Sequence, residues 1–177
     1  DIGIVVLPDF VSFSDVSEGG SGEVDLRVLN VGSREEPVND SCIDLEGDGT
    51  CDGLCTGGEA EKVLGGTLGC DVTKVDGSNE GKGFVLAPTD AEEGGDDERV
   101  ITISWSPVAG NTEIPAGTVL RLETNLTPSF LEVPVTGGNA GVLRVDADES
   151  AICGEQLCLA AESDTPADTT TWTGSLE

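Results

Sequence analysis

The stretch "EVDLRVLNV" (residues 23–31) alternates apolar and charged side chains along its length. Leu26 and Val28 follow Val24 at intervals of two, with a charged residue in each gap. Successive side chains of a β-strand point to opposite faces of the sheet. The pattern therefore predicts a strand with one buried face and one solvated face.

Similar short runs recur along the chain, and clusters of Gly, Ser and Asn separate them. They cover residues 2–7, 99–105, 118–124, 130–135 and 141–145. In the run 99–105 the alternation places Trp105 on the apolar face, which predicts a core position. Helical periodicity is nearly absent. Many short strands without helices predict an all-β fold of the antiparallel β-sandwich type.

The charge of the chain is extreme. Asp and Glu number 35 against 8 Lys and Arg, which gives a formal net charge of -27. Such a surface repels nucleic acids and anionic lipids, so we expect no nucleic-acid partner. No run of apolar residues is long enough to predict membrane insertion. The charge favours divalent cations or a saline exterior that screens self-repulsion, and the organised apolar runs argue against disorder.

Six cysteines lie in polar segments of the chain. An even number is typical of disulfide bonds formed in an oxidising compartment, and free buried thiols are the alternative. The chain also starts at Asp1, as a processed protein would after removal of a signal peptide. These features predict a secreted protein, located outside the cell or on its surface.

Four of the cysteines lie within residues 40–83, a segment rich in Gly and Asp with little alternation. They are Cys42, Cys51, Cys55 and Cys70. We expect bridges among them to staple the segment as an insertion that has no hydrophobic core of its own. Spacing leaves the connectivity of these four open. Cys153 and Cys158 flank a short turn and are predicted to pair with each other.

The stretch "CIDLEGDGTCDGLC" (residues 42–55) has the spacing of a calcium loop. The predicted ligands are Asp44, Glu46, Asp48, Thr50 and Asp52. Alternate carboxylates can point into a tight loop that a glycine turns, and Thr50 can supply its carbonyl. Cys55 stands where an EF-hand has a bidentate Glu, so the stretch is closer to Cys-containing extracellular calcium repeats. We predict calcium as a cofactor; a turn with solvated carboxylates is the alternative.

Residues for catalysis are scarce. The chain contains no His, so no Ser or Cys has the commonest partner of a nucleophile. Carboxylate pairs are plentiful, but aromatic residues make up only 3% of the chain, which disfavours a sugar-binding cleft. We therefore expect no enzymatic activity. Asn39 and Asn125 start N-glycosylation sequons, which matter only in a host that glycosylates.

Several motifs occur in a characteristic order. Pro8 precedes a short strand that ends at Phe13, and a Gly-rich turn (19–22) leads to a strand that ends in Asn30-x-Gly32. Later stretches are "ITISWSPVAG" (101–110) and "LRLETN…LEVPVTGG" (120–138). This order resembles the Hydin-type (ASH) immunoglobulin-like domains of bacterial cell-surface proteins, over about 1–39 and 84–138. The resemblance implies an immunoglobulin-like antiparallel β-sandwich with a structural or binding role.

We therefore predict an immunoglobulin-like sandwich over residues 1–138 and a C-terminal strand extension over residues 139–177. The extension would pack on the same domain or on a neighbouring subunit, as an added strand. The predicted function is an extracellular structural subunit of a surface assembly, such as a filament or pilus-like polymer joined by β-strand contacts. Its partners would be further copies or other surface proteins. The alternative is a calcium-dependent surface module that binds a carbohydrate or another ligand.

Overall fold

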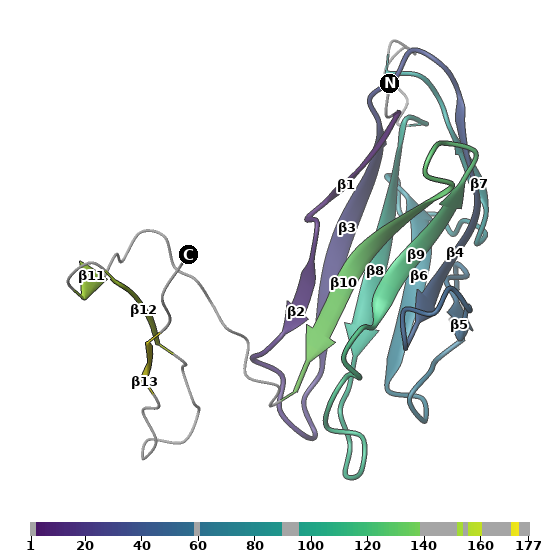
Figure 1. The fold of residues 1–177 in the computed structure, drawn as a ribbon. Coiled ribbons are helices and arrows are strands. Elements are labelled where there is room, and N and C mark those ends of the chain that lie inside the picture. The colour runs from purple at the N-terminus through teal and green to yellow at the C-terminus, as the bar shows by residue number, and fades with distance from the viewer. Residues whose placement is uncertain are drawn as a thin grey trace. The chain divides into compact units, whose positions relative to one another are not determined.

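The structure is a computed structural model that describes residues 3–58, 61–89 and 96–138 in full, and the backbone of three short strands further on. β-Strands are the only long regular elements of these residues. Those before residue 139 are β1 (Ile4–Leu7), β2 (Val11–Phe13), β3 (Gly22–Asn30), β4 (Glu36–Asp44), β5 (Gly53–Leu54), β6 (Leu68–Lys74), β7 (Phe84–Leu86), β8 (Glu98–Trp105), β9 (Val119–Thr124) and β10 (Phe130–Gly137). They form two sheets that pack face to face (Figure 1).

The first sheet has the strand order β1-β3-β8-β6, and each neighbouring pair is antiparallel. The alternating stretch of the sequence is β3, as predicted. Its Leu26 and Val28 are fully buried, whereas Asp25 and Arg27 are exposed. The apolar face of β3 therefore lines the core, and the charged face meets solvent.

The second sheet has the order β2-β10-β9-β4-β5, and β7 pairs with the N-terminal part of β4. The pair β2–β10 is parallel, unlike the other pairs. It arises because the chain crosses from β1 in the first sheet to β2 in the second sheet without reversing (Figure 1). The two sheets correspond to the ABED and GFC sheets of an immunoglobulin-like sandwich, so the predicted fold class is confirmed.

The core lies between the inner faces of the two sheets. Ile101 and Ile103 of β8 and Leu120 and Leu122 of β9 are fully buried there. Trp105 is also fully buried, as its place in the alternation predicted, and its ring centroid lies 5.9 Å from that of Phe13. Side chains from strands far apart in sequence thus hold the two sheets together.

The segment 40–83 is stapled by two disulfides, Cys42–Cys51 and Cys55–Cys70. The expectation that it has no hydrophobic core was wrong. It contains β6, an edge strand of the first sheet, whose Leu68 and Val72 are fully buried. β6 does alternate, but Cys70, which was predicted to be a bridging loop residue, occupies the buried position between Leu68 and Val72. The segment therefore contributes to the sandwich itself as well as to its loops.

Residues Asn139–Glu177 form a compact unit separate from Asp1–Gly138. Its strands β11 (Ile152–Cys153), β12 (Gln156–Ala160) and β13 (Thr171–Thr173) pair with one another in the order β11-β12-β13. In this sheet the backbone of Cys153 lies opposite Gln156. The side chains of these strands, and with them the predicted Cys153–Cys158 bridge, lie outside the described residues. So does the strand predicted at 141–145.

Candidate functional site

The acidic loop, residues 44–52, connects β4 to β5 in a hairpin. Ile43 pairs with Gly53 at the end of the two strands. The disulfide Cys42–Cys51 joins the last turn of the loop back to β4. All five predicted calcium ligands therefore lie in one short connection whose two ends are fixed to the second sheet.

The Asp44 carboxylate is buried at the start of this loop and accepts four backbone hydrogen bonds. Its Oδ1 lies 2.7 Å from the Gly47 amide and 3.3 Å from the amides of Glu46 and Asp48. Its Oδ2 lies 2.8 Å from the Gly49 amide. Gly47 and Gly49 have φ angles of 65° and 91°, which side chains disfavour. These charge-assisted bonds hold the loop closed around the carboxylate.

The other predicted ligands, Glu46, Asp48, Thr50 and Asp52, are exposed. Asp48 Oδ1 accepts a bond of 2.8 Å from the Thr50 amide, and Asp52 Oδ2 accepts one of 2.8 Å from the Leu45 amide. Among the described residues, no group of three or more acidic, Cys or His side chains is arranged to hold a metal ion. The carboxylates of Asp44, Asp48 and Asp52 each face a backbone donor, so calcium binding stays a prediction from the motif.

Replacing Asp44 with Ala is expected to lower the free energy of unfolding by about 2–3 kcal/mol, because four loop amides lose their buried, charged acceptor. Urea denaturation measures the loss. The exposed Asp48 gives a matched control, and its replacement with Ala should cost well under about 1 kcal/mol. If Asp44 acts through the loop amides, the loss is the same in EDTA and in millimolar calcium. A loss that appears only in calcium would instead identify Asp44 as a metal ligand.

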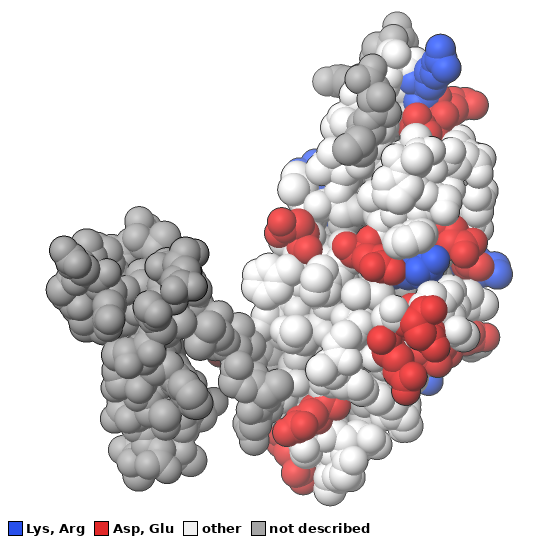
Figure 2. All heavy atoms as spheres, in the orientation of Figure 1, with Lys and Arg blue, Asp and Glu red and all other residues white. Residues whose placement is uncertain are grey.

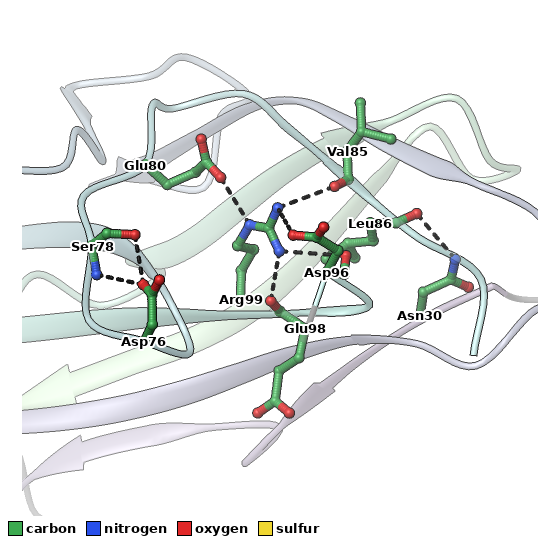
Figure 3. Close-up of polar contacts among 9 residues, drawn as sticks. All are labelled: Asn30, Asp76, Ser78, Glu80, Val85, Leu86, Asp96, Glu98 and Arg99. Carbon is green, nitrogen blue, oxygen red and sulfur yellow. Dashed lines mark hydrogen bonds and ion pairs between the residues drawn. The ribbon is translucent and has the colours of Figure 1, made fainter. Parts of the chain in front are cut away.

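The arginine cluster around Arg99 was not identified from the sequence (Figure 3). The Arg99 side chain is only 5% exposed, and its Nε lies 2.9 Å from Glu80 Oε2. Nη1 donates to the Glu98 carbonyl at 2.8 Å, and Nη2 lies 3.6 Å from Asp96 Oδ1. Nη2 also donates to the Val85 carbonyl at 3.4 Å. Arg99 thus ties the connections on both sides of β7 to the start of β8.

One signal in the sequence could have revealed this arginine. The alternation of Ile101, Ile103 and Trp105, extended two residues back, places Arg99 on the inner face of the sheet. A charged residue at an inward position requires partners, because an unpaired buried charge is strongly unfavourable. Arg99 meets that requirement with carboxylates and carbonyls, which makes the cluster a structural joint between segments.

Asn30, part of the Asn-x-Gly motif, forms a second such connection at the C-terminal end of β3, which pairs with the start of β8 (Figure 3). It is buried, and its Nδ2 donates to the carbonyls of Ala87 at 2.8 Å and Leu86 at 3.3 Å. Its Oδ1 accepts from the Gly32 amide at 2.8 Å. The motif therefore has a physical role here: one amide side chain links the first sheet to β7 in the second sheet.

Arg27 and Glu98 form a pair on the outer face of the first sheet, where both Nε and Nη2 of Arg27 donate to the Glu98 carboxylate. The hydrogen bond from Arg27 and its charge lower the pKa of Glu98, and the bond from Glu98 raises the pKa of Arg27. Because the pKa of Glu98 is lower in the folded state than in the unfolded chain, the pair stabilises the fold above about pH 4.3. This contribution is lost as the pH falls through the folded pKa.

The variant Glu98→Gln should therefore have a slightly lower melting temperature than the wild type near pH 7, because Arg27 keeps only a neutral acceptor. At a pH below the lowered folded pKa of Glu98, where the wild-type carboxyl is also protonated, the difference should disappear. Thermal unfolding of both proteins across this pH range, at one salt concentration, measures the effect. An equal difference at both ends of the range would show that the glutamate acts through packing alone.

The two sequon asparagines lie side by side. Asn39 Nδ2 donates to Asn125 Oδ1 at 2.9 Å, and both residues are exposed. Asn39 belongs to β4, at an irregularity in its pairing with β9, and Asn125 follows the end of β9. Their meeting follows from the β4–β9 pairing. Modification of either side chain stays a prediction from the sequon.

The two disulfides indicate the kind of cellular compartment in which the protein is found. Cys42–Cys51 and Cys55–Cys70 indicate an oxidising, non-cytosolic compartment. The described part of the chain also contains no helix with the length and apolar character needed to cross a bilayer. The predicted extracellular location is finer than these observations and belongs to the proposal below.

Comparisons of the chain with protein-family models, with curated proteins and with solved structures found no match. The fold class therefore rests on the strand order and burial of this chain. The resemblance to Hydin-type domains stays a prediction. The acidic loop and the arginine cluster are accordingly interpreted from their own geometry.

Proposed function

We propose that the protein is an extracellular structural module of a surface assembly, in which modules meet through β-strand contacts. The support begins with the fold. A disulfide-stapled β-sandwich withstands an oxidising exterior and offers sheet edges to which further strands can add. The functional side chains found above, Asp44 and Arg99, hold loops and strands in place, which agrees with a structural role.

The observation that carries the proposal is the side of the sandwich formed by β1 and β2. These consecutive strands are the end strands of the first and the second sheet (Figure 1). Leu7 and Phe10 stand on either side of the crossover between them and are 48% and 52% exposed. Exposed apolar residues beside open strand edges favour association with another chain.

The opposite side of the sandwich is protected. The edge strand β6 is hydrogen-bonded to the segment that follows it: Glu80 N donates to Val72 O at 2.9 Å, and Lys74 N donates to Ser78 O at 2.9 Å. A covered edge resists pairing with other chains, so the β1–β2 side, where Leu7 and Phe10 are exposed, is the better contact surface.

The test is self-association of the full chain. We expect the wild type to form larger species as its concentration rises, and the double variant Leu7→Lys/Phe10→Lys to stay monomeric, because lysines on a strand edge oppose pairing. Sedimentation velocity in molar salt, which suppresses the repulsion between acidic molecules, measures the distribution. Val75→Lys is the matched control, since Val75 is 55% exposed after the end of β6.

Two outcomes would count against this function. A wild type that remains monomeric at millimolar concentration would exclude self-assembly, and equal association of the two lysine variants would exclude the β1–β2 side as the contact. The melting temperatures of all three proteins separate a loss of contact from a loss of folding.

A further inference from the structure

Most carboxylates of the chain have no basic partner. Four basic side chains of the described residues form ion pairs with acids, and they are Arg27, Lys82, Arg99 and Arg121. Even if each of the 8 Lys and Arg neutralised one acid, 27 carboxylates would remain. Internal ion pairing therefore cannot remove the excess negative charge.

This excess lies on the outside of the sandwich. Figure 2 shows Asp and Glu at several separate places on one face, with few Lys or Arg among them. Exposed acids of the sandwich include Asp9, Asp15, Glu18, Glu23, Glu35 and Glu113. They come from loops and strands throughout the domain and form no single site. The relevant quantity is therefore the summed repulsion over the surface.

Folding concentrates this charge, because the compact state brings together carboxylates that the unfolded chain keeps far apart. The distance over which they repel depends on salt: the Debye length is about 30 Å at 0.01 M, about 8 Å at 0.15 M and about 3 Å at 1 M. At low salt each carboxylate therefore repels others across much of the domain, whereas in molar salt it acts only on its nearest neighbours.

We propose that the sandwich is a salt-dependent fold, which is stable in molar salt and loses most of its stability at low ionic strength. The inference does not depend on the proposed function. It identifies the medium in which the protein works as a concentrated salt solution, where the acidic surface is screened and keeps the protein soluble.

The experiment is urea denaturation of the full chain at NaCl concentrations from about 20 mM to about 2 M, since urea is uncharged and leaves the screening unchanged. We expect the urea midpoint to rise with salt, most steeply below about 1 M, where the Debye length changes most. The melting temperature should rise by on the order of 15 °C over the same range. Equal midpoints at the two extremes would overturn the proposal.

Two further measurements identify the cause. The variant D9N/D15N/E18Q/E23Q/E35Q/E113Q removes six surface charges, so it should be more stable than the wild type at low salt and respond less to NaCl. Sucrose strengthens burial without screening charge, so it should not reproduce the rise. An unchanged salt response of the variant, or a full response to sucrose, would contradict screening.

Calcium provides the last comparison. If screening acts alone, CaCl2 at low millimolar concentration stabilises the protein no more than a NaCl solution of the same ionic strength that contains EDTA. Stabilisation by calcium that disappears in Asp44→Ala and persists in the six-site variant would overturn the proposal in favour of a bound ion in the acidic loop.

Discussion

Replacing Trp105 with Ala is expected to lower the free energy of unfolding by about 3–5 kcal/mol, which is a large part of the stability of a typical domain. Trp105 is fully buried at the end of β8, where its backbone lies opposite Gly22 of β3 and Leu68 of β6. Its ring also fills the space beside Gly137, whose hypothetical Cβ would lie 2.8 Å from the ring. The substitution would leave a cavity bordered by β3, β6, β8 and β10.

The control is Trp105→Phe, which keeps most of the aromatic volume. The indole Nε1 is buried and has no hydrogen-bond partner in the described part of the chain. Its removal therefore breaks no bond, and we expect the Phe variant to lose only about 1–2 kcal/mol from the smaller ring. Urea denaturation followed by circular dichroism, in molar salt, compares the variants. A loss below about 1 kcal/mol for the Ala variant would show that the core collapses around the missing ring.

The sequence predicted strands such as β3 and β8, whose alternation is regular, and missed β4, whose alternation is broken. β4 contains Pro37 and the buried polar residues Ser41 and Asp44, and its pairing with β9 shifts between Val38 and Asp40. Such an irregularity changes the face to which later side chains point, so a period of two is lost. Partner strands far away in the sequence decide these positions, and a local pattern cannot include them.

The acidic loop shows a similar limit. Carboxylates at alternate positions and a glycine predict a tight loop, and the loop is present between β4 and β5. The same spacing allows oxygens to point toward an ion or toward backbone amides. The positive φ angles of Gly47 and Gly49 direct amides to Asp44, and spacing alone does not specify this choice.

Removing the disulfide Cys55–Cys70, by replacing both residues with Ala, is expected to lower the free energy of unfolding by more than about 3 kcal/mol. The bond closes 15 residues, and the restriction of the unfolded chain over such a loop accounts for about 3 kcal/mol. Both cysteines are buried in the core cluster. Cys70 lies in β6 of the first sheet and Cys55 follows β5 of the second, so the bond also ties the two sheets together.

The second disulfide is the matched control for this effect. Cys42–Cys51 closes a segment of similar length, 9 residues, so its effect on the unfolded chain is close to that of Cys55–Cys70. Its bond stays within one hairpin, however, and Cys51 is exposed. Urea denaturation of the two double-Ala variants should therefore show the larger loss for Cys55 and Cys70, and the difference measures the packing between sheets. Equal losses would mean that both disulfides act through the unfolded chain alone, and that the sheets are held together by their apolar residues without covalent help.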